Sequence, residues 1–229
     1  HVYCEWPLGR DLAEAQEMAA AARQSTAHVT MGLQGENSWA VRHAAQLVKD
    51  GAIGRPLSLR VVSPTAGWGA VSPPNYAYLQ DKSNGATLST IAGGHTLAAM
   101  EAVVGAFTEV GARASILLDT MTLMGTSETV ERTCADHLLL FGQHDSGCVS
   151  SLEVVGGVSN VPFQFELRGE TGQLTITGGH AGGFQVGRLE VVTSPASTPQ
   201  PAPVVADIAV QSANVAELWA RFAGDIESG

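Results

Sequence analysis

The sequence opens with a strand–helix–strand unit, and no other feature restricts the possible folds as strongly. Apolar residues run into Glu5-Trp6-Pro7, which predicts a buried strand that ends at the proline. Asp11 with Glu14 forms a capping-box pattern, and apolar residues at helical spacing then predict a helix over 12–23. Residues 28–31 predict a second strand. Such a unit belongs to a parallel sheet covered by helices, and one unit cannot fold alone.

The hydrophobic pattern changes its period near Gly54-Arg55-Pro56. Before this point, Asn37 or Ser38 can cap a second helix that ends at Gly51. After it, the sequence alternates between inward apolar and outward side chains over residues 57–62, the period of a half-buried strand. A different architecture therefore begins at about residue 56.

Strands dominate the predicted elements after residue 62. The aperiodic loop over 64–84 contains Trp68, Tyr76 and Tyr78; a loop this long is often functional, although its aromatic residues can equally just pack on the core. A helix is predicted over 95–104. The strand-like runs after it are residues 109–116, 133–141, 148–155, 163–168, 174–177 and 189–192.

The end of the chain predicts a connection and one more helix. Residues 194–203 are rich in Pro, Ser, Thr and Ala, which is typical of an exposed and partly extended segment. A helix capped near Asn214 then places Leu218, Trp219 and Phe222 on one face. Together these elements predict an α+β fold with a large, mostly antiparallel sheet.

Composition narrows the classes of function. The chain has 229 residues, of which 45% are hydrophobic and 15% charged, so it can bury a substantial core. The formal net charge of −10 opposes attraction to phosphate backbones and anionic membranes, so we expect no nucleic-acid partner and no membrane partner. No apolar run is long enough to span a bilayer, and no signal segment opens the sequence.

Cysteine and histidine spacing argues against bound metal. Cys4, Cys134 and Cys148 lack a paired spacing, so neither a disulfide scaffold nor a structural zinc site is expected, and a cytoplasmic location fits. No H-E-x-x-H or C-x-x-C motif occurs. The glycine-dense run over 178–183 fits neither dinucleotide-binding nor P-loop spacing and predicts a wide hairpin turn.

Two segments are candidates for chemistry. Glu5-Trp6-Pro7 stands at the carboxyl end of a parallel strand, where open α/β sheets bind ligands, although a proline-stiffened strand exit would look the same. The run from Gly85 to His95 delivers a histidine to the start of a helix, whose dipole favours a neutral imidazole able to exchange protons near neutral pH. A histidine that merely caps the helix or fills a polar gap is the alternative.

Taken in order, these segments resemble the glucose-fructose oxidoreductase, inositol dehydrogenase and MocA family. The resemblance covers nearly the whole chain and is carried by Glu5-Trp6-Pro7, the helix over 12–23, the strand over 28–31, Gly51-Ala52-Ile53-Gly54 and the run from Gly85 to His95. It implies that residues 1–31 are the C-terminal remnant of a dinucleotide-binding Rossmann α/β domain. Residues 32–229 would form an α+β substrate and dimerisation domain, incomplete at its C-terminus, in a fragment of a longer protein.

The resemblance assigns roles position by position. His95 matches the family's acid–base histidine, and Glu5 and Pro7 match their motif partners. Trp6 stands where the family has a lysine that reaches the nicotinamide, and Ile91 stands where it has an aspartate. Glu-Trp-Pro together with Gly-Gly-His resembles the branch that includes the fungal galactose-pathway repressor.

These assignments lead to two hypotheses about function. The first is an NAD- or NADP-dependent oxidoreductase acting on a sugar, polyol or related alcohol, with His95 as the catalytic group. Cofactor contacts are then expected from Glu5, Trp6, Pro7 and Gln34. Substrate contacts are expected from Tyr76, Tyr78 and Lys82, and Lys82 would also replace the missing catalytic lysine.

The second hypothesis is a non-catalytic dinucleotide-binding regulator in which Trp6 stacks against the cofactor and the sheet presents a partner surface. Under either hypothesis we expect a small carbohydrate-like ligand and a homo-oligomer formed through the large sheet. The residue that selects NAD or NADP comes after the second strand of a Rossmann domain, which this sequence does not contain.

Overall fold

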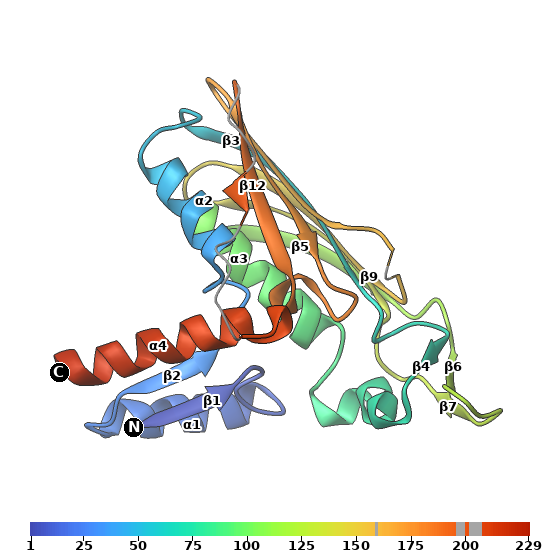
Figure 1. Ribbon diagram of the computed structural model, residues 1–229. Helices are drawn as coiled ribbons and strands as arrows, with labels where there is room; N and C mark the ends of the chain where they lie inside the picture. Colours follow the sequence, from blue (N-terminus) through green and yellow to red (C-terminus); the bar gives the residue numbers. More distant parts are fainter. Residues whose placement is uncertain (159, 196–199, 202–207) are drawn as a thin grey trace.

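Three sheets organise the residues that the computed structural model describes, which are 1–158, 160–195, 200–201 and 208–229 (Figure 1). The helices are α1 (Leu12–Gln24), α2 (Trp39–Lys49), α3 (Gly94–Val104) and α4 (Ala213–Ser228). The strands are β1 (Val2–Glu5), β2 (Val29–Gly32), β3 (Pro56–Thr65), β4 (Val71–Ser72), β5 (Phe107–Ser115), β6 (Thr120–Leu123), β7 (Thr129–Glu131), β8 (His137–His144), β9 (Val149–Gly156), β10 (Phe163–Gly169), β11 (Gln173–Gly179), β12 (Arg188–Ser194) and β13 (Gln200–Pro201).

The predicted strand–helix–strand unit is confirmed. Strands β1 and β2 pair in parallel, and α1 connects them. The Asp11 carboxylate accepts a hydrogen bond from the Glu14 backbone N–H at 3.1 Å, which caps α1. Helices α1 and α4 lie on opposite sides of this small sheet (Figure 1), and the Tyr3 ring stacks on Trp219 of α4 with centroids 4.3 Å apart.

Helix α2 begins and ends where its sequence signals predict. The Ser38 hydroxyl accepts a hydrogen bond from the Val41 N–H at its start. At its end, the Gly51 N–H donates to Val48 and the Ala52 N–H donates to Leu47. This is a Schellman motif, and it requires the positive φ of 75° at Gly51. Helices α2 and α3 pack together, and α2 contacts β11 and β12.

An eight-stranded sheet forms the body of the molecule, in the order β13-β12-β11-β10-β3-β9-β8-β5. Only the β3–β9 pairing within it is parallel, so the prediction of a large, mostly antiparallel sheet is confirmed. One face packs under α2 and α3 and supplies Leu59, Val61, Phe165 and Ile176 to the core. The other face leaves apolar side chains exposed, including 68% of Phe141.

Several short elements differ from the sequence expectations. The loop over 64–84 contains β4 and two short 3₁₀ helices, Pro74–Gln80 and Lys82–Asn84. Strands β6 and β7, which the sequence did not predict, pair with β4 in a small third sheet. Strands of three or four residues show too little alternation to recognise.

Three further expectations from the sequence differ from the structure in where an element begins or ends or in what can be described. The strand expected from residue 133 begins only at His137, because the preceding residues turn around a buried ion pair between Arg132 and Asp136. Ser212, not Asn214, precedes α4, and Asn214 donates instead to the Gln185 carbonyl at 2.8 Å. The connection expected over 194–203 lies partly outside the described residues, and Gln200–Pro201 within it pairs with β12.

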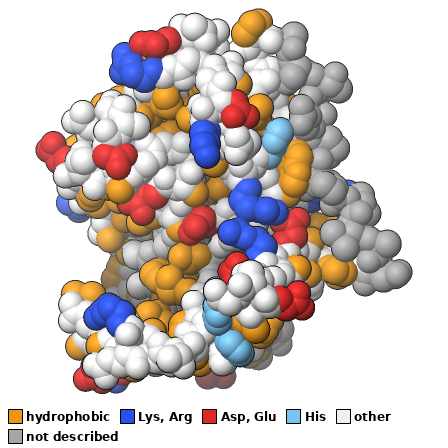
Figure 2. Space-filling view, turned by 90° about the vertical axis from the view of Figure 1, so that its left-hand side faces the viewer, with side chains coloured by type: hydrophobic (Ala, Val, Ile, Leu, Met, Phe, Trp, Pro, Cys, Tyr) orange, Lys and Arg blue, Asp and Glu red, His pale blue; other side chains and the backbone are white. Residues whose placement is uncertain are grey.

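Charges of both signs mix with apolar side chains on the side where α2 and α4 lie (Figure 2). A groove there runs between α2, α3 and α4, and two of the cations that line it, Arg42 and Arg221, have polar partners. Arg42 forms an ion pair with Glu217, and Arg221 donates to the Asn37 side chain. Among the described residues, every helix is too short or too polar to cross a bilayer.

Candidate functional site

Two predicted cofactor contacts, Glu5 and Gln34, stand at the carboxyl ends of β1 and β2. Glu5 pairs in register with Gly32, and its carboxylate lies over the Gly32 backbone. A Cβ atom at position 32 would stand 2.3 Å from the Glu5 Oε2 atom, so a side chain there would displace the Glu5 carboxylate. Gln34 stands two residues further along, 9% exposed, with a buried Oε1 atom that has no hydrogen-bond partner among the described residues.

Trp6 connects this strand end to the start of α3. Its indole N–H donates to the Thr90 carbonyl oxygen at 2.6 Å. The same ring lies against Gly94, where a Cβ atom would stand 2.4 Å from Trp6 Nε1. Gly94, the second glycine of the Gly-Gly-His sequence, therefore leaves room for the Trp6 indole.

The segment before α3 has an unusual backbone. Residues Ser89–Gly93 form a π-helical turn, a feature that often marks functional sites. The Thr90 hydroxyl donates to the Gly85 carbonyl at 2.6 Å and accepts from the Thr87 N–H at 2.8 Å. These contacts fix the Thr90 carbonyl that Trp6 uses.

His95 lies in the first turn of α3 and is 3% exposed. Its Nδ1 atom is buried and finds no hydrogen-bond partner among the described residues. Burial away from water lowers the pKa of His95 from 6.5 to about 4, so the ring is neutral as expected, but its pKa lies well below the neutral range in which the sequence predicted proton exchange. The alternative of a histidine that merely caps the helix is not what the structure shows, because α3 has no side-chain cap.

A pocket of about 470 Å³ opens beside this helix start. We call it the aromatic pocket; it is lined by Thr65, Ala66, Gly67, Trp68, Val71, Ser72, Pro73, Tyr76, Tyr78, Leu79, Ile91, Ala92, Met124, His180, Ala181, Gly182 and Gln185. None of these is Asp, Glu, Lys or Arg. Ile91, at the position where the family has aspartate, thus lies in the wall of the pocket one turn before His95.

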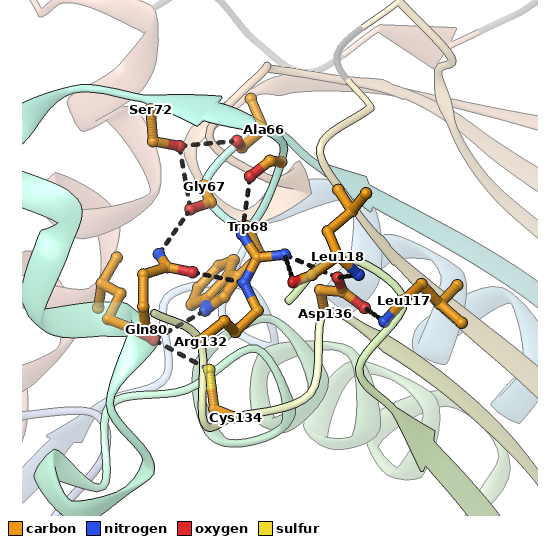
Figure 3. Close-up of polar contacts among 12 residues, drawn as sticks. Ala66, Gly67, Trp68, Ser72, Gln80, Leu117, Leu118, Arg132, Cys134 and Asp136 are labelled. Carbon is orange, nitrogen blue, oxygen red and sulfur yellow. Dashed lines mark hydrogen bonds and ion pairs between the residues drawn. The ribbon is translucent and has the colours of Figure 1, made fainter. Parts of the chain in front are cut away.

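A buried polar network holds one wall of the aromatic pocket (Figure 3). Arg132 and Asp136 form an ion pair at 2.7 Å, with side chains 0% and 4% exposed. The Arg132 guanidinium also donates to Gln80 Oε1 and to the Gly69 carbonyl. Asp136 in turn accepts hydrogen bonds from two backbone N–H groups, those of Leu117 and Leu118, both at 2.9 Å.

The network reaches the pocket through the loop over 64–84. Gln80 donates to the carbonyls of Gly67 and Tyr76, and the Trp68 indole donates to the Leu79 carbonyl at 3.2 Å. The aromatic residues of this loop are therefore held in place by a charge pair on a segment about fifty residues later in the sequence.

The structure brings some of the predicted site residues together and leaves others apart. Tyr76 and Tyr78 line the aromatic pocket. Glu5, Trp6 and Pro7 lie at the end of β1, and Trp6 touches the helix start that carries His95. Lys82 is exposed on a short 3₁₀ helix and does not line the pocket.

The turn between β11 and β12 supplies pocket residues that the sequence did not identify, His180 and Gln185. The glycine-dense run over 178–183 is the predicted hairpin turn, and it also forms a pocket wall. Its density of glycines was the one signal that could have revealed this. Among the described residues, no three His, Cys, Asp or Glu side chains cluster as metal ligands would.

Comparison with known sequences adds two kinds of relative. The galactose/lactose metabolism regulatory protein GAL80 of Kluyveromyces lactis is 29% identical over 203 residues, which cover 82% of this chain and 44% of that protein. The dehydrogenase aclE of Aspergillus oryzae is 30% identical over 193 residues, which cover 77% of this chain and 50% of that protein. The chain thus spans about half the length of these curated relatives.

Solved structures share the fold. The transcriptional regulator Gal80p of Kluyveromyces lactis superposes with a TM-score of 0.82 at 23% identity, over 96% of this chain and 57% of that one. Levoglucosan dehydrogenase in complex with NADH and L-sorbose superposes with a TM-score of 0.78 at 20% identity, over 100% of this chain and 65% of that one.

The family profile described as "Gal80p, C-terminal domain" matches residues 40–178, more than half of the chain. Its relatives include both regulators and oxidoreductases of the glucose-fructose oxidoreductase, inositol dehydrogenase and MocA type, as the sequence motifs predicted. The chain belongs to the Gal80p C-terminal domain-like family.

Proposed function

We propose that this chain is part of an NAD- or NADP-dependent oxidoreductase that transfers hydride to or from an uncharged, sugar-like alcohol. The observation that carries the proposal is His95, a buried and neutral imidazole with an unpartnered Nδ1 atom, which does not itself line the aromatic pocket but stands one helical turn after Ile91 in its wall. Buried polar atoms in native proteins are nearly always hydrogen-bonded, so an exception next to a pocket supports a role toward a ligand.

The residues at the ends of β1 and β2 fit the nicotinamide end of a dinucleotide. Gln34 Oε1 is a buried acceptor without a partner among the described residues, and the carboxamide group of a nicotinamide is a hydrogen-bond donor. Glu5, Trp6 and Pro7 would form the rest of this contact. When bound, the dinucleotide would supply the hydride-carrying ring.

The phosphates would be held by residues outside this sequence, which contains no G-x-G-x-x-G fingerprint. We therefore propose that residues 1–31 end a dinucleotide-binding domain and that residues 32–229 form the substrate and dimerisation domain. The exposed face of the eight-stranded sheet, with Leu139, Phe141 and Val149, is the surface we assign to a second copy of the chain.

His95 would take up the proton that the alcohol releases, because a neutral imidazole has a free lone pair. None of the described residues in the pocket wall carries a charge that would stabilise the resulting imidazolium, since Ile91 replaces the family's carboxylate. We expect turnover slower than in family members with that aspartate. Introducing the carboxylate by Ile91→Asp should raise the pKa of His95 and the rate together.

Variants of the complete gene product test this assignment. We expect His95→Gln to lower kcat for oxidation of neutral cyclic alcohols by about 100-fold or more, because proton transfer by a positioned side chain contributes at least that much. Lys82→Ala tests the proposed replacement of the family lysine and should lower the rate if Lys82 moves toward the substrate. An unchanged kcat in His95→Gln would remove His95 from the chemistry.

A second function, a dinucleotide-sensing regulator without turnover, is favoured by Trp6. The indole occupies the position of the family lysine, donates its only N–H to Thr90 and packs on Gly94, so this position offers no amine for proton transfer. Dinucleotide binding to the complete gene product without turnover of any neutral alcohol, together with capture of a second protein, would support this function over the first.

A further inference from the structure

Gln185 has an unusual environment in the wall of the aromatic pocket. Its side chain is 6% exposed, and its Oε1 atom is buried with no hydrogen-bond partner among the described residues. The Nε2 atom of the same amide donates to the Gly182 carbonyl at 3.3 Å, which fixes which way round the amide lies. A flipped amide would place two oxygens against each other, so the acceptor is the free atom.

The backbone around Gln185 is held firmly. Asn214 of α4 donates to the Gln185 carbonyl at 2.8 Å. The preceding Phe184 is buried and stacks on Phe163, with ring centroids 4.4 Å apart. The amide lies against Gly183, where a Cβ atom would stand 2.4 Å from Gln185 Oε1. The Oε1 atom is itself fully buried, so a ligand reaches it when the side-chain amide turns toward the pocket while the backbone stays in place.

The rest of the pocket limits the charge of the ligand. None of the described residues in its wall is an Asp, Glu, Lys or Arg that could pair with an ionised group. A carboxylate, phosphate or ammonium group that leaves water for this wall gains no Asp, Glu, Lys or Arg partner in return, which is unfavourable. Trp68, Tyr76 and Tyr78 instead offer aromatic surface that suits an apolar ring face.

We propose that the aromatic pocket binds an uncharged ring compound that donates a hydrogen bond to Gln185 Oε1, and that Gln185 is the residue that selects for the donor. This rests in part on the proposed function, under which the ligand is the substrate and its hydroxyl is recognised at a point separate from His95. A site that leaves a buried polar group unpaired rejects an analogue that lacks the matching hydroxyl.

Three probes with the same cyclohexane ring separate the effect of a hydrogen-bond donor on binding from the effect of charge. They are cyclohexanol, methoxycyclohexane and cyclohexanecarboxylate. Their binding to the complete gene product is measured by saturation-transfer NMR, which detects weak binding without turnover. We expect cyclohexanol to bind about tenfold more tightly than methoxycyclohexane, the ratio that one ordinary hydrogen bond supplies. Cyclohexanecarboxylate should bind more weakly than either.

The variant Gln185→Met keeps the side-chain length and removes the acceptor. We expect it to bind cyclohexanol and methoxycyclohexane equally and to melt at a temperature no lower than the wild-type protein, because the unpaired atom is gone. Gln143→Met, on an exposed glutamine of β8, serves as the matched control and should keep the wild-type preference.

Equal binding of cyclohexanol and methoxycyclohexane by the wild-type protein would overturn the proposal. So would undetectable cyclohexanol binding, preferred binding of the carboxylate, or a preference that survives in Gln185→Met. If Gln185→Met does not fold, Gln185→Leu and the wild-type probe series decide. Donor selection without turnover would support this assignment while contradicting the oxidoreductase, and turnover without donor selection would do the reverse.

Discussion

At the residue scale, Trp6 packs against Gly94, the residue directly before His95. The indole covers the start of α3 because Gly94 has no side chain, and His95 comes next in a setting that excludes water. The sequence identified both the glycine and the histidine but not the contact of Gly94 with Trp6, whose hydrogen bond to Thr90 joins residues 84 positions apart. Burial of the imidazole lowers its pKa.

The stability of the protein should depend on pH through His95. Because the folded pKa of about 4 lies below the ordinary value of 6.5, the unfolded chain binds more protons between these values. Stability contributed by this group is complete above pH 6.5, falls as the pH drops toward 4, and changes no further below. The total is on the order of 3 kcal/mol.

Urea unfolding of wild-type protein and His95→Gln at a series of pH values checks this. The variant replaces the titrating ring with a neutral amide. As the pH falls from 6.5 toward 4, the wild-type protein should therefore lose stability relative to the variant, and the difference in unfolding free energy between them should shrink or reverse. Parallel pH profiles for the two proteins would show that His95 is not buried as described.

The substitution Gly94→Ala should displace Trp6. The added methyl group would stand 2.4 Å from the indole, a distance that no packing arrangement tolerates. We expect the loss of the Trp6–Thr90 hydrogen bond, a red-shifted tryptophan fluorescence and a lower unfolding free energy. Gly224→Ala in α4 is the control: nothing described lies within 4 Å of its Cβ position, and it should stabilise the helix by about 1 kcal/mol.

At the element scale, the pocket loop over 64–84 depends on β7 and the segment after it. Arg132 directly follows β7 and binds the loop through Gln80 and Gly69, and Asp136 pairs with its guanidinium. Both charges are satisfied by several hydrogen bonds, so the pair is tolerated although water is excluded. The loop's aromatic side chains take their positions from this arrangement.

Removing the guanidinium should be costly. Arg132→Met leaves the Asp136 carboxylate buried without its cation, and breaking a buried pair in this way costs about 3–5 kcal/mol. Thermal and urea unfolding measure the loss. Arg168→Met, whose side chain is 63% exposed, is the matched control and should cost less than about 1 kcal/mol. Similar losses in the two variants would contradict the importance of the network.

Local pattern was enough to predict most of the elements. Ser38 and Gly51 mark the ends of α2 because capping depends on neighbouring residues, and residues 57–62 alternate because one face of β3 is buried. Sequence could not reveal the Arg132–Asp136 pair or the free Gln185 acceptor. Arg132 and Asp136 are only four residues apart, but their burial depends on Gln80 and Gly69 more than fifty residues earlier, and the Gln185 acceptor is free because of how its turn packs in the folded chain.

At the scale of the whole molecule, α4 links the small parallel sheet to the aromatic pocket. Trp219 and Phe222 contact Tyr3 of β1, while Asn214 at the other end binds the turn that carries Gln185. Helix α4 therefore supports both the strand–helix–strand unit, beside which it lies in Figure 1, and the turn that carries Gln185. A shift of the small parallel sheet should therefore change the position of the turn that carries Gln185, and the reverse.

Trp219→Ser should loosen the strand–helix–strand unit without unfolding the large sheet. The stacked pair with Tyr3 contributes about 0.5–1.5 kcal/mol beyond its buried area. We expect faster amide hydrogen exchange in residues 1–32 and unchanged exchange in β9 and β10. Leu12→Ser, on a side chain that is 72% exposed, should change neither. Uniformly faster exchange would mean that the two parts unfold together.

The proposed function depends above all on hydride transfer at the site beside His95 in the protein to which this chain belongs. The most direct measurement tracks a deuterium label from the carbinol carbon of a neutral cyclic alcohol to the nicotinamide ring, by NMR, with the complete gene product and NAD or NADP. We predict label on the ring, with the rate reduced about 100-fold or more in His95→Gln. Bound dinucleotide that never acquires deuterium would contradict hydride transfer and leave the regulator.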